Sequence, residues 1–153
     1  MNKLIEFESN LDDLLIFSKK IAGISRKGDW FFLKGDLGAG KTTFAKSYIQ
    51  SLFELNKTDL PINIKSPSFP IVISYPLKNY TIYHYDFFRL NNKEELKEID
   101  IFENSENNIS IVEWPNIILD NFQFSNFYLI DFDILDLNKR LISIFILIRI
   151  PYK

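Results

Sequence analysis

The chain has 153 residues, a length typical of one domain, so we expect a single domain over residues 1–153. Hydrophobic residues make up 46% and charged residues 25%, which excludes a disordered or low-complexity chain. The net charge of −2 argues against a protein that coats nucleic acid with a basic surface. The absence of cysteine excludes disulfides, thiol catalysis and cysteine-ligated metals, and a single histidine gives little basis for a zinc site.

No segment has the pattern of an export signal or a membrane helix. Acidic residues between Glu6 and Asp13 interrupt the apolar run that a secretory signal needs. The most apolar stretch, 141–150, contains Ser143 and Arg149 and is about half of the ~20 residues that a membrane helix requires. We therefore expect a soluble, cytoplasmic protein without membrane contact.

The first predicted elements are a helix, a strand and a second helix. Ser9, followed three residues later by an acid and then by apolar residues at helical spacing, predicts an N-capped helix that ends near Gly23. Residues 29–34 are aromatic and bounded by glycine, which predicts a strand. After a glycine-rich turn at 35–40, residues 41–55 have one apolar face and predict a helix packed on a sheet.

The rest of the chain predicts mainly strands. A polar loop with two prolines comes first, over 56–68. The elements that follow are strands over 69–75 and 80–85, a short helix over 92–99, a buried strand over 109–112 and strands over 127–134 and 141–150. This order fits an α/β fold, a three-layer P-loop NTPase-like domain with a mixed central sheet.

The glycine-rich turn satisfies the phosphate-binding pattern G-x-x-x-x-G-K-[ST] in full. The predicted nucleotide-binding residues are Gly35, Asp36, Leu37, Gly38, Ala39, Gly40, Lys41, Thr42 and Thr43. Glycine lets backbone N–H groups wrap a phosphate, and the next helix aims its positive N-terminal end at the anion. Lys41 would bridge the β- and γ-phosphates, and Thr42 would ligate Mg²⁺. A fortuitous glycine turn is disfavoured by the flanking strand and helix, so we predict an ATP or ADP site with Mg²⁺.

A magnesium site of this kind also needs a carboxylate at the end of a second apolar strand. Glu113 follows the strand over 109–112, and Asp86 follows the strand over 80–85. Taken alone, either acid can also be a solvated strand-end residue.

Residues 56–59 (N-K-T-D) match the motif with which GTPases read guanine. In GTPases that motif follows a late strand, whereas here it trails the phosphate-binding helix by a few residues. No D-x-x-G sequence occurs in the chain. We interpret the segment as a polar loop.

Four motifs, in order and spacing, resemble the TsaE (YjeE) family. They are residues 35–43, 66–69 (S-P-S-F), 84–90 (H-Y-D-F-F-R-L) and 112–115 (V-E-W-P). The resemblance spans nearly the whole chain. It implies an ATPase that works with TsaD and TsaB to form N6-threonylcarbamoyladenosine at position 37 of tRNAs reading codons that begin with A. It implies contact with tRNA only through that complex.

The resemblance also implies site roles. Lys41, Asp86 and Glu113 match catalytic positions, and Thr42, Glu113 and Asp86 match the metal site. Ser68 stands in place of a usual Thr and keeps the hydroxyl.

Two other positions depart from the family. Phe88 replaces a Tyr, so any role for that phenol is lost. Leu14 replaces a frequent Thr of the first helix, which puts a contact with the nucleotide base there in doubt.

Three further motif residues keep two interpretations each. His84 can carry protons near neutral pH, but we favour a buried, hydrogen-bonded histidine. Trp114 can stack on a partner or a base, although core or cleft-wall packing is favoured. Arg89 can serve the nucleotide, a partner surface or a local ion pair.

The alternative function is a small P-loop kinase acting on a metabolite or nucleotide. Kinases carry several arginines to clamp acceptor and phosphates. Of the four arginines here, Arg26, Arg140 and Arg149 lie outside the motifs, so the acceptor site of a kinase is hard to place. A nucleotide-gated binding module is a third interpretation.

With one arginine in the motifs, we expect slow ATP hydrolysis by the isolated chain and acceleration by TsaB and TsaD.

Overall fold

The computed structural model of this protein describes residues 1–61 and 63–148, and these form seven strands and four α-helices. The strands are β1 (Asn2–Ser9), β2 (Trp30–Gly35), β3 (Val72–Pro76), β4 (Thr81–Asp86), β5 (Ile109–Glu113), β6 (Asn126–Ile134) and β7 (Arg140–Ile148). The helices are α1 (Leu11–Ile24), α2 (Lys41–Leu55), α3 (Lys93–Ile99) and α4 (Asn116–Asn121), with a 3₁₀ turn at Ser105–Asn107. No helix among the described residues is long and apolar enough to cross a membrane.

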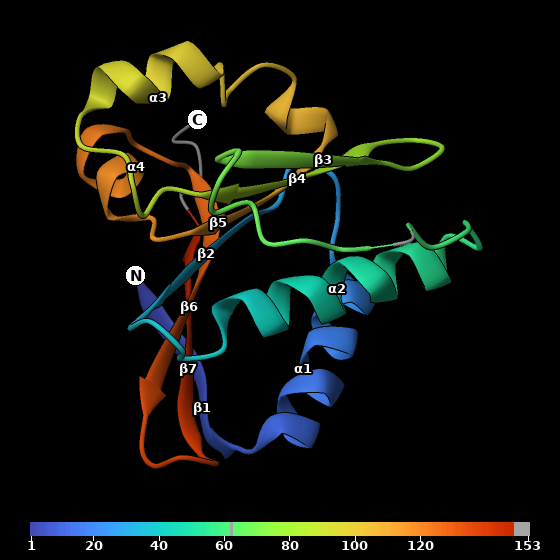
Figure 1. The fold of residues 1–153 in the computed structure, drawn as a ribbon, viewed down its shortest axis with the longest axis vertical. Coiled ribbons are helices and arrows are strands. Elements are labelled where there is room, and N and C mark those ends of the chain that lie inside the picture. Colours follow the sequence, from blue (N-terminus) through green and yellow to red (C-terminus); the bar gives the residue numbers. More distant parts are fainter. Residues whose placement is uncertain (62, 149–153) are drawn as a thin grey trace.

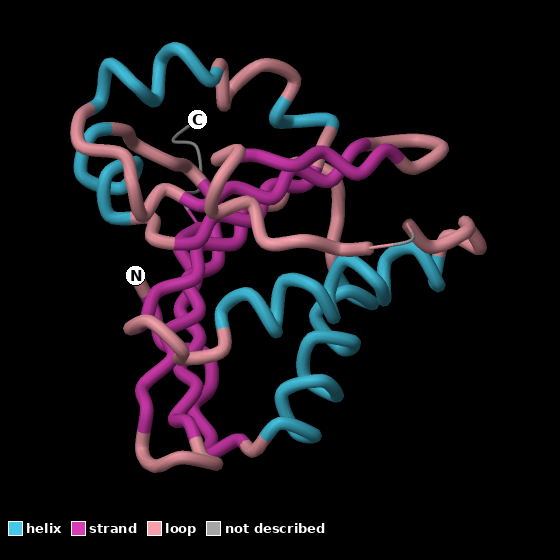
Figure 2. The backbone as a smooth tube through the Cα atoms, viewed as in Figure 1, coloured by secondary structure: helices cyan, strands magenta, loops and turns pink. Residues whose placement is uncertain are grey.

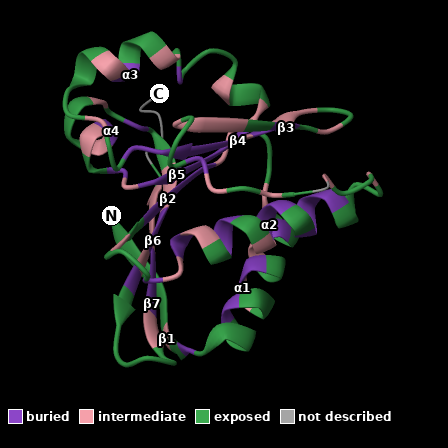
Figure 3. Ribbon diagram, in the orientation of Figure 1, coloured by how far each residue is buried: buried purple, intermediate pink, exposed green. Residues whose placement is uncertain are grey.

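Helices cover both faces of the sheet, with α1 and α2 on one side and α3 and α4 on the other (Figure 1). The alternation of β2 explains this arrangement, because successive strand residues point to opposite faces. Phe31 and Leu33 pack in the cluster that includes α2, whereas Trp30 and Phe32 pack in the cluster that includes Leu96 of α3. The central strands are therefore buried on both sides (Figure 3). The expected α/β class and mixed sheet are confirmed.

The sheet order is β1-β7-β6-β2-β5-β4-β3. The central strands β6, β2, β5 and β4 are parallel, and antiparallel pairs complete both sides. Parallel strands end at the same edge of a sheet, where open α/β folds collect their ligands. Gly35, Asp86 and Glu113 end three of these strands, and Asp86 is the register partner of Glu113. The topology thus gathers residues from distant parts of the sequence at one edge.

The N-terminal region differs from the sequence-based prediction. Strand β1 was not predicted because it is an edge strand with most residues exposed, so it lacks a clear alternation. The cap of α1 is Asn10 rather than Ser9. The Asn10 side chain accepts from the Asp13 N–H (2.9 Å), and the Asp13 carboxylate accepts from the Asn10 N–H (3.1 Å). The helix ends at Ile24, which agrees with the predicted end near Gly23.

The ends of other strands and helices differ from the predicted ones for local reasons. The predicted strand over 69–75 begins only at Val72, because Ile71 has a φ of +70° and donates to the Pro67 carbonyl, which closes a turn. Helix α4 was missed because its six residues are too few for an apolar period to show. The strand predicted over 141–150 is β7, and residues 149–150 lie outside the described residues.

The capping box of α1 makes a testable prediction. Asn10→Ala removes the acceptor for the Asp13 N–H and should lower the free energy of unfolding by about 1 kcal/mol. Asn10→Ser retains a capping oxygen and should lose much less. Thermal unfolding of both variants measures the difference, and equal losses would show that Asn10 does not act as a cap.

Candidate active site

The turn between β2 and α2 forms a cradle of main-chain groups. Gly38 and Gly40 have φ values of +76° and +111°, a region that glycine enters without strain. The Ala39 N–H donates to the Asp36 carbonyl (3.1 Å) and closes the turn. Because α2 begins at Lys41, the N–H groups of its first turn have no partners within the helix. These groups and the helix dipole favour an anion at this turn.

Lys41 lies folded against this turn. Its ammonium donates to the carbonyls of Gly35 (2.6 Å) and Asp36 (2.8 Å) and lies 4.1 Å from the centre of the Trp114 ring. The residue is only 4% exposed. Burial lowers the pKa of Lys41, and the nearby carboxylates of Glu113 and other acids oppose this effect. The Lys41 ammonium therefore lies beside the loop, and an anionic oxygen could replace its two carbonyl partners.

Glu113 connects the loop helix to β4. The Thr42 hydroxyl donates to one carboxylate oxygen of Glu113 (2.9 Å), and the other lies 2.8 Å from Nε2 of His84. His84 is fully buried, and its Nδ1 has no hydrogen-bond partner among the described residues. The interpretation of His84 as a buried, hydrogen-bonded residue is confirmed. Both Glu113 oxygens are thereby oriented, one towards Thr42 and one towards the sheet interior.

Asp86 completes the acidic side of the site. It is 7% exposed, and its carboxylate accepts from the Phe88 N–H (3.0 Å). Burial raises the pKa of Asp86, and the neighbouring carboxylate of Glu113 raises it further, while the hydrogen bond from the Phe88 N–H and the charge of Lys41 oppose the shift. The ionised form is thus destabilised in the protein without a bound cation.

The oxygens of Thr42, Glu113 and Asp86 are of the kind that Mg²⁺ prefers, and they come from neighbouring ends of α2, β5 and β4. No group of three or more His, Cys, Asp or Glu side chains that could hold a metal exists among residues 1–61 and 63–148. A cation here would need other oxygens, from water or a phosphate. These three residues would suit Mg²⁺ that takes its remaining oxygens from water or a nucleotide.

Aromatic side chains form one wall of the site. Trp114 has a φ of +55° and turns the chain from β5 towards α4, and its ring contacts Phe88 at a centroid distance of 4.7 Å. Phe88 is 59% exposed. The favoured interpretation of Trp114 as a cleft wall agrees with these contacts.

Arg89 holds the segment that carries Ser68. Its guanidinium donates from Nε (2.9 Å) and from Nη2 to the Ser68 carbonyl, and its charge lies 4.5 Å from the centre of the Phe69 ring. No acidic residue pairs with Arg89 in the described parts of the chain, so a local ion pair is not observed. The loop after α2 thus returns from the far end of that helix to the site (Figure 2).

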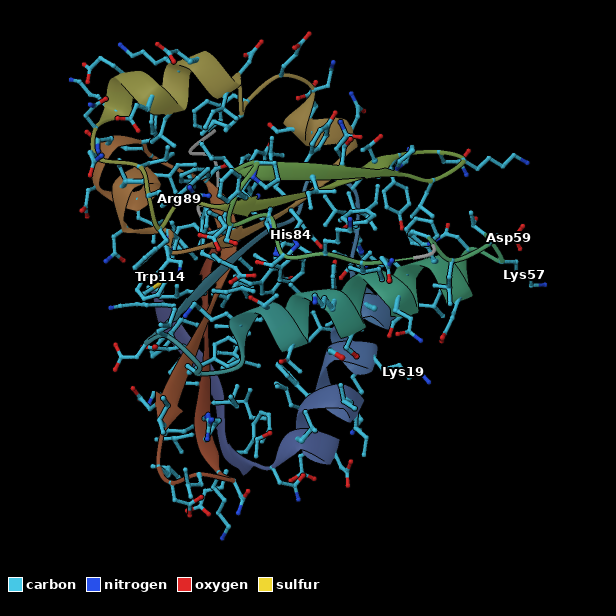
Figure 4. All side chains as sticks on the ribbon, viewed as in Figure 1. Lys19, Lys57, Asp59, His84, Arg89 and Trp114 are labelled. Carbon is cyan, nitrogen blue, oxygen red and sulfur yellow. The ribbon has the colours of Figure 1, made fainter. Side chains whose placement is uncertain are left out.

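The segment at 56–59 lies away from the site. Figure 4 shows Lys57 and Asp59 at the opposite end of α2 from Trp114 and His84. The Asn56 side chain donates to the Leu52 carbonyl (2.7 Å) and to the Tyr80 hydroxyl (3.1 Å). These contacts end the helix, so the interpretation as a polar loop is confirmed.

The sequence did not indicate that Arg140 contacts the phosphate-binding loop. Arg140 is the first residue of β7, yet its guanidinium donates to the carbonyls of Ala39 and Gly38, both at 3.1 Å. These partners are 101 and 102 residues away in sequence, so no local motif could reveal them. A cavity of about 550 Å³ lies beside the contact and is lined in part by Arg140, Thr43 and Leu14. Leu14 thus gives the cavity an apolar wall.

Comparisons with known proteins point to one family. The family model "TsaE: Threonylcarbamoyl adenosine biosynthesis protein TsaE" matches residues 8–141. Curated relatives bear the name "tRNA threonylcarbamoyladenosine biosynthesis protein TsaE". The one from Rickettsia felis is 35% identical over 89% of this chain and 76% of its own length. The one from Haemophilus influenzae is 32% identical over 74% of this chain and 72% of its own length.

A solved structure has the same fold. The crystal structure of YdiB from Bacillus subtilis superposes with a TM-score of 0.70 at 22% identity, covering 94% of this chain and 86% of that one. At this identity the likeness concerns the fold.

The raised pKa of Asp86 makes a prediction about stability. Asp86→Asn removes the buried charge and keeps an oxygen for the Phe88 N–H. At neutral pH without added nucleotide, the variant should unfold at a higher temperature than the parent chain, by about 2–4 °C for each kcal/mol gained at this chain length.

The pH dependence of this difference follows from linkage. A carboxyl whose pKa is raised on folding stabilises the protein below its unfolded pKa, and that stabilisation is lost as the pH rises through the folded pKa. The advantage of Asp86→Asn should therefore disappear at acidic pH, as measured by thermal unfolding across pH. The exposed Asp120→Asn is the control, and an equal gain there would contradict the assignment to burial.

Proposed function

This chain belongs to the TsaE family and takes part in tRNA threonylcarbamoyladenosine biosynthesis, and on that premise we propose that it is a Mg²⁺-dependent ATPase. It acts with TsaD and TsaB in threonylcarbamoylation of adenosine 37 in tRNAs that read codons beginning with A. TsaD and TsaB carry the contact with tRNA, and this chain supplies ATP turnover to the complex.

The contact between Thr42 and Glu113 carries the proposal of ATP hydrolysis. It joins the hydroxyl that follows the loop lysine to the acid of a second parallel strand, the two protein groups that a P-loop NTPase uses around magnesium. Asp86 is the register partner of Glu113 and adds a second carboxylate at the same edge. Mg²⁺ held by these three residues would neutralise negative charge on the phosphate oxygens.

The loop supports binding of the phosphates. Its main-chain donors and the start of α2 favour the β-phosphate, and Lys41 can exchange its bonds to Gly35 and Asp36 for bonds to phosphate oxygens. Lys41 would thus exchange two carbonyl partners for an anionic one when a nucleotide binds. ATP and ADP both fit this mode of binding, and the γ-phosphate of ATP adds a contact with Lys41.

Slow hydrolysis by the chain alone is the second part of the proposal. An arginine finger is worth ~10³ to 10⁵ in turnover in related NTPases. Arg89 and Arg140 both donate to main-chain carbonyls, of Ser68 and of the loop. Neither is free to stabilise a transferring phosphate unless its contacts change. Assembly with TsaB and TsaD would reorder the segment that carries Ser68, a known route of switching.

Nucleotide affinity tests the site. Lys41→Ala removes the buried cation at the loop and should weaken Mg-ATP binding roughly 10- to 10²-fold, the loss typical of a hydrogen bond to a charged group. Lys46→Ala, on the exposed side of the same helix, is the control and should bind normally. Calorimetric titration with Mg-ATP and Mg-ADP measures both, and unchanged affinity in Lys41→Ala would refute a site at residues 35–43.

Phosphate release tests the function. We expect slow release from the isolated chain and faster release when TsaB and TsaD are added. Glu113→Gln keeps an oxygen for Thr42 but removes the charge, and it should lower Mg²⁺-dependent turnover roughly 10- to 100-fold. A multiple-turnover tRNA modification assay with the same variants connects hydrolysis to the pathway.

Two outcomes would contradict the proposal. Equal rates of phosphate release with and without TsaB and TsaD would show that hydrolysis is not coupled to these partners. Transfer of the γ-phosphate to an added metabolite or nucleotide, instead of its release, would identify a kinase.

A further inference from the structure

We infer that Arg140 is a positioning residue that holds residues 38–40 in the conformation that receives a phosphate. The inference rests on the proposed binding of nucleotide at this loop. Arg140 lies outside every motif of the loop and comes from the opposite end of the chain, at the start of β7. Its role follows from where its hydrogen bonds go.

All three nitrogens of the Arg140 guanidinium donate to main-chain carbonyls. Nε and Nη2 donate to Ala39 and Gly38 of the loop, both at 3.1 Å. Nη1 donates to Asp136 (2.7 Å) and Lys139 (3.1 Å) of the turn between β6 and β7. A guanidinium is a rigid planar fork, so these bonds fix the loop relative to the turn. With its nitrogens so engaged, Arg140 is not arranged as a free phosphate clamp.

The turn between β6 and β7 is a firm anchor for this bridge. The Asp136 carboxylate accepts from the N–H groups of Asn138 (2.7 Å) and Lys139 (2.8 Å). The Lys139 carbonyl accepts from the N–H of Leu135 (3.0 Å), which closes the turn. The carbonyls that receive Nη1 therefore belong to a turn that is ordered by its own hydrogen bonds.

The orientation of the loop peptides follows from the bond to Ala39. In a trans peptide the carbonyl and the next N–H point in opposite directions, and no peptide bond in the described residues is cis. The Ala39 carbonyl points towards Arg140, so the Gly40 N–H points the other way. The preceding peptide, between Gly38 and Ala39, is held by two hydrogen bonds. Its Gly38 carbonyl accepts from Arg140, and its Ala39 N–H donates to the Asp36 carbonyl. Arg140 thus decides which side of the loop presents donors.

The two glycines make this restraint necessary. Gly38 and Gly40 adopt positive φ values, but glycine also populates other regions at little cost. The space beside Gly38 is open, since a Cβ placed there would meet nothing within 4 Å. Without Arg140 the loop would sample several conformations, and the apparent affinity for a nucleotide would fall by the fraction that remains competent.

Binding measurements on the whole chain test this role. If a tenth of the free loop stays competent, Arg140→Gln should weaken Mg-ADP and Mg-ATP by the same factor, about tenfold. Equal loss is expected because both ligands place a β-phosphate in the loop. Arg140→Lys can reach one carbonyl and should lose less. Lys139→Gln removes the same charge from the neighbouring exposed position and should bind within about twofold of the parent chain.

NMR of the free protein separates positioning from direct contact with the nucleotide. In Arg140→Gln, the amide signals of Gly38, Ala39 and Gly40 should broaden or shift and then sharpen at saturating Mg-ADP. The parent chain and Lys139→Gln should show sharp signals in both states. Should Arg140→Gln fail to fold, as thermal unfolding would reveal, Arg140→Lys serves for the same comparison.

The outcomes distinguish this inference from the proposed function. If Lys41→Ala loses nucleotide and Arg140→Gln does not, the ATPase proposal stands and the positioning role is overturned. If Arg140→Gln loses affinity while its free loop signals match those of the parent chain, Arg140 contacts the ligand directly and positioning is again overturned. If the parent chain binds no nucleotide, the proposed function fails, and the free-protein spectra still decide whether Arg140 orders the loop.

Discussion

The hydrogen bond from Thr42 to Glu113 spans 71 residues and depends on the parallel pairing at the centre of the sheet. Leu33 near the end of β2 is the register partner of Glu113, so the loop that follows β2 begins beside the acid. A shift of one residue in this register would turn the Glu113 side chain to the other face of the sheet. The core packing that fixes the register therefore also fixes the distance between the loop helix and the carboxylate.

Both faces of β2 and β5 contribute to this register. Phe32 and Val112 pack in one cluster, and Phe31 and Ile111 pack in the other. Strands buried on two sides cannot slide without exposing large side chains on both. Aromatic side chains on both faces of β2 thus contribute to the register, while Phe88 and Phe69 remain exposed at the site.

Much of this site could be predicted from the sequence because its main parts are local. A glycine loop, a lysine and the start of a helix form one continuous segment, and acids at strand ends follow from the alternation of strands and helices. The capping residue and β1 could not be fixed, since Ser9 and Asn10 are both good caps and an edge strand has a weak pattern. Arg140 could not be found because a contact across 101 residues depends on how the last hairpin packs.

Burial of two charged side chains at the site fits the proposed ligand. Burial destabilises the charged forms of both Lys41 and Asp86, as the directions of their pKa shifts show. A Mg²⁺–nucleotide would offer ionic partners to both, phosphate oxygens to Lys41 in place of two carbonyls and a cation to Asp86. If the proposed ligand binds the folded chain and not the unfolded one, its binding would offset the stability that these buried charges remove. The cost of burying these charges would therefore be recovered when the ligand binds. A variant that removes one of the buried charges should gain stability and lose affinity together.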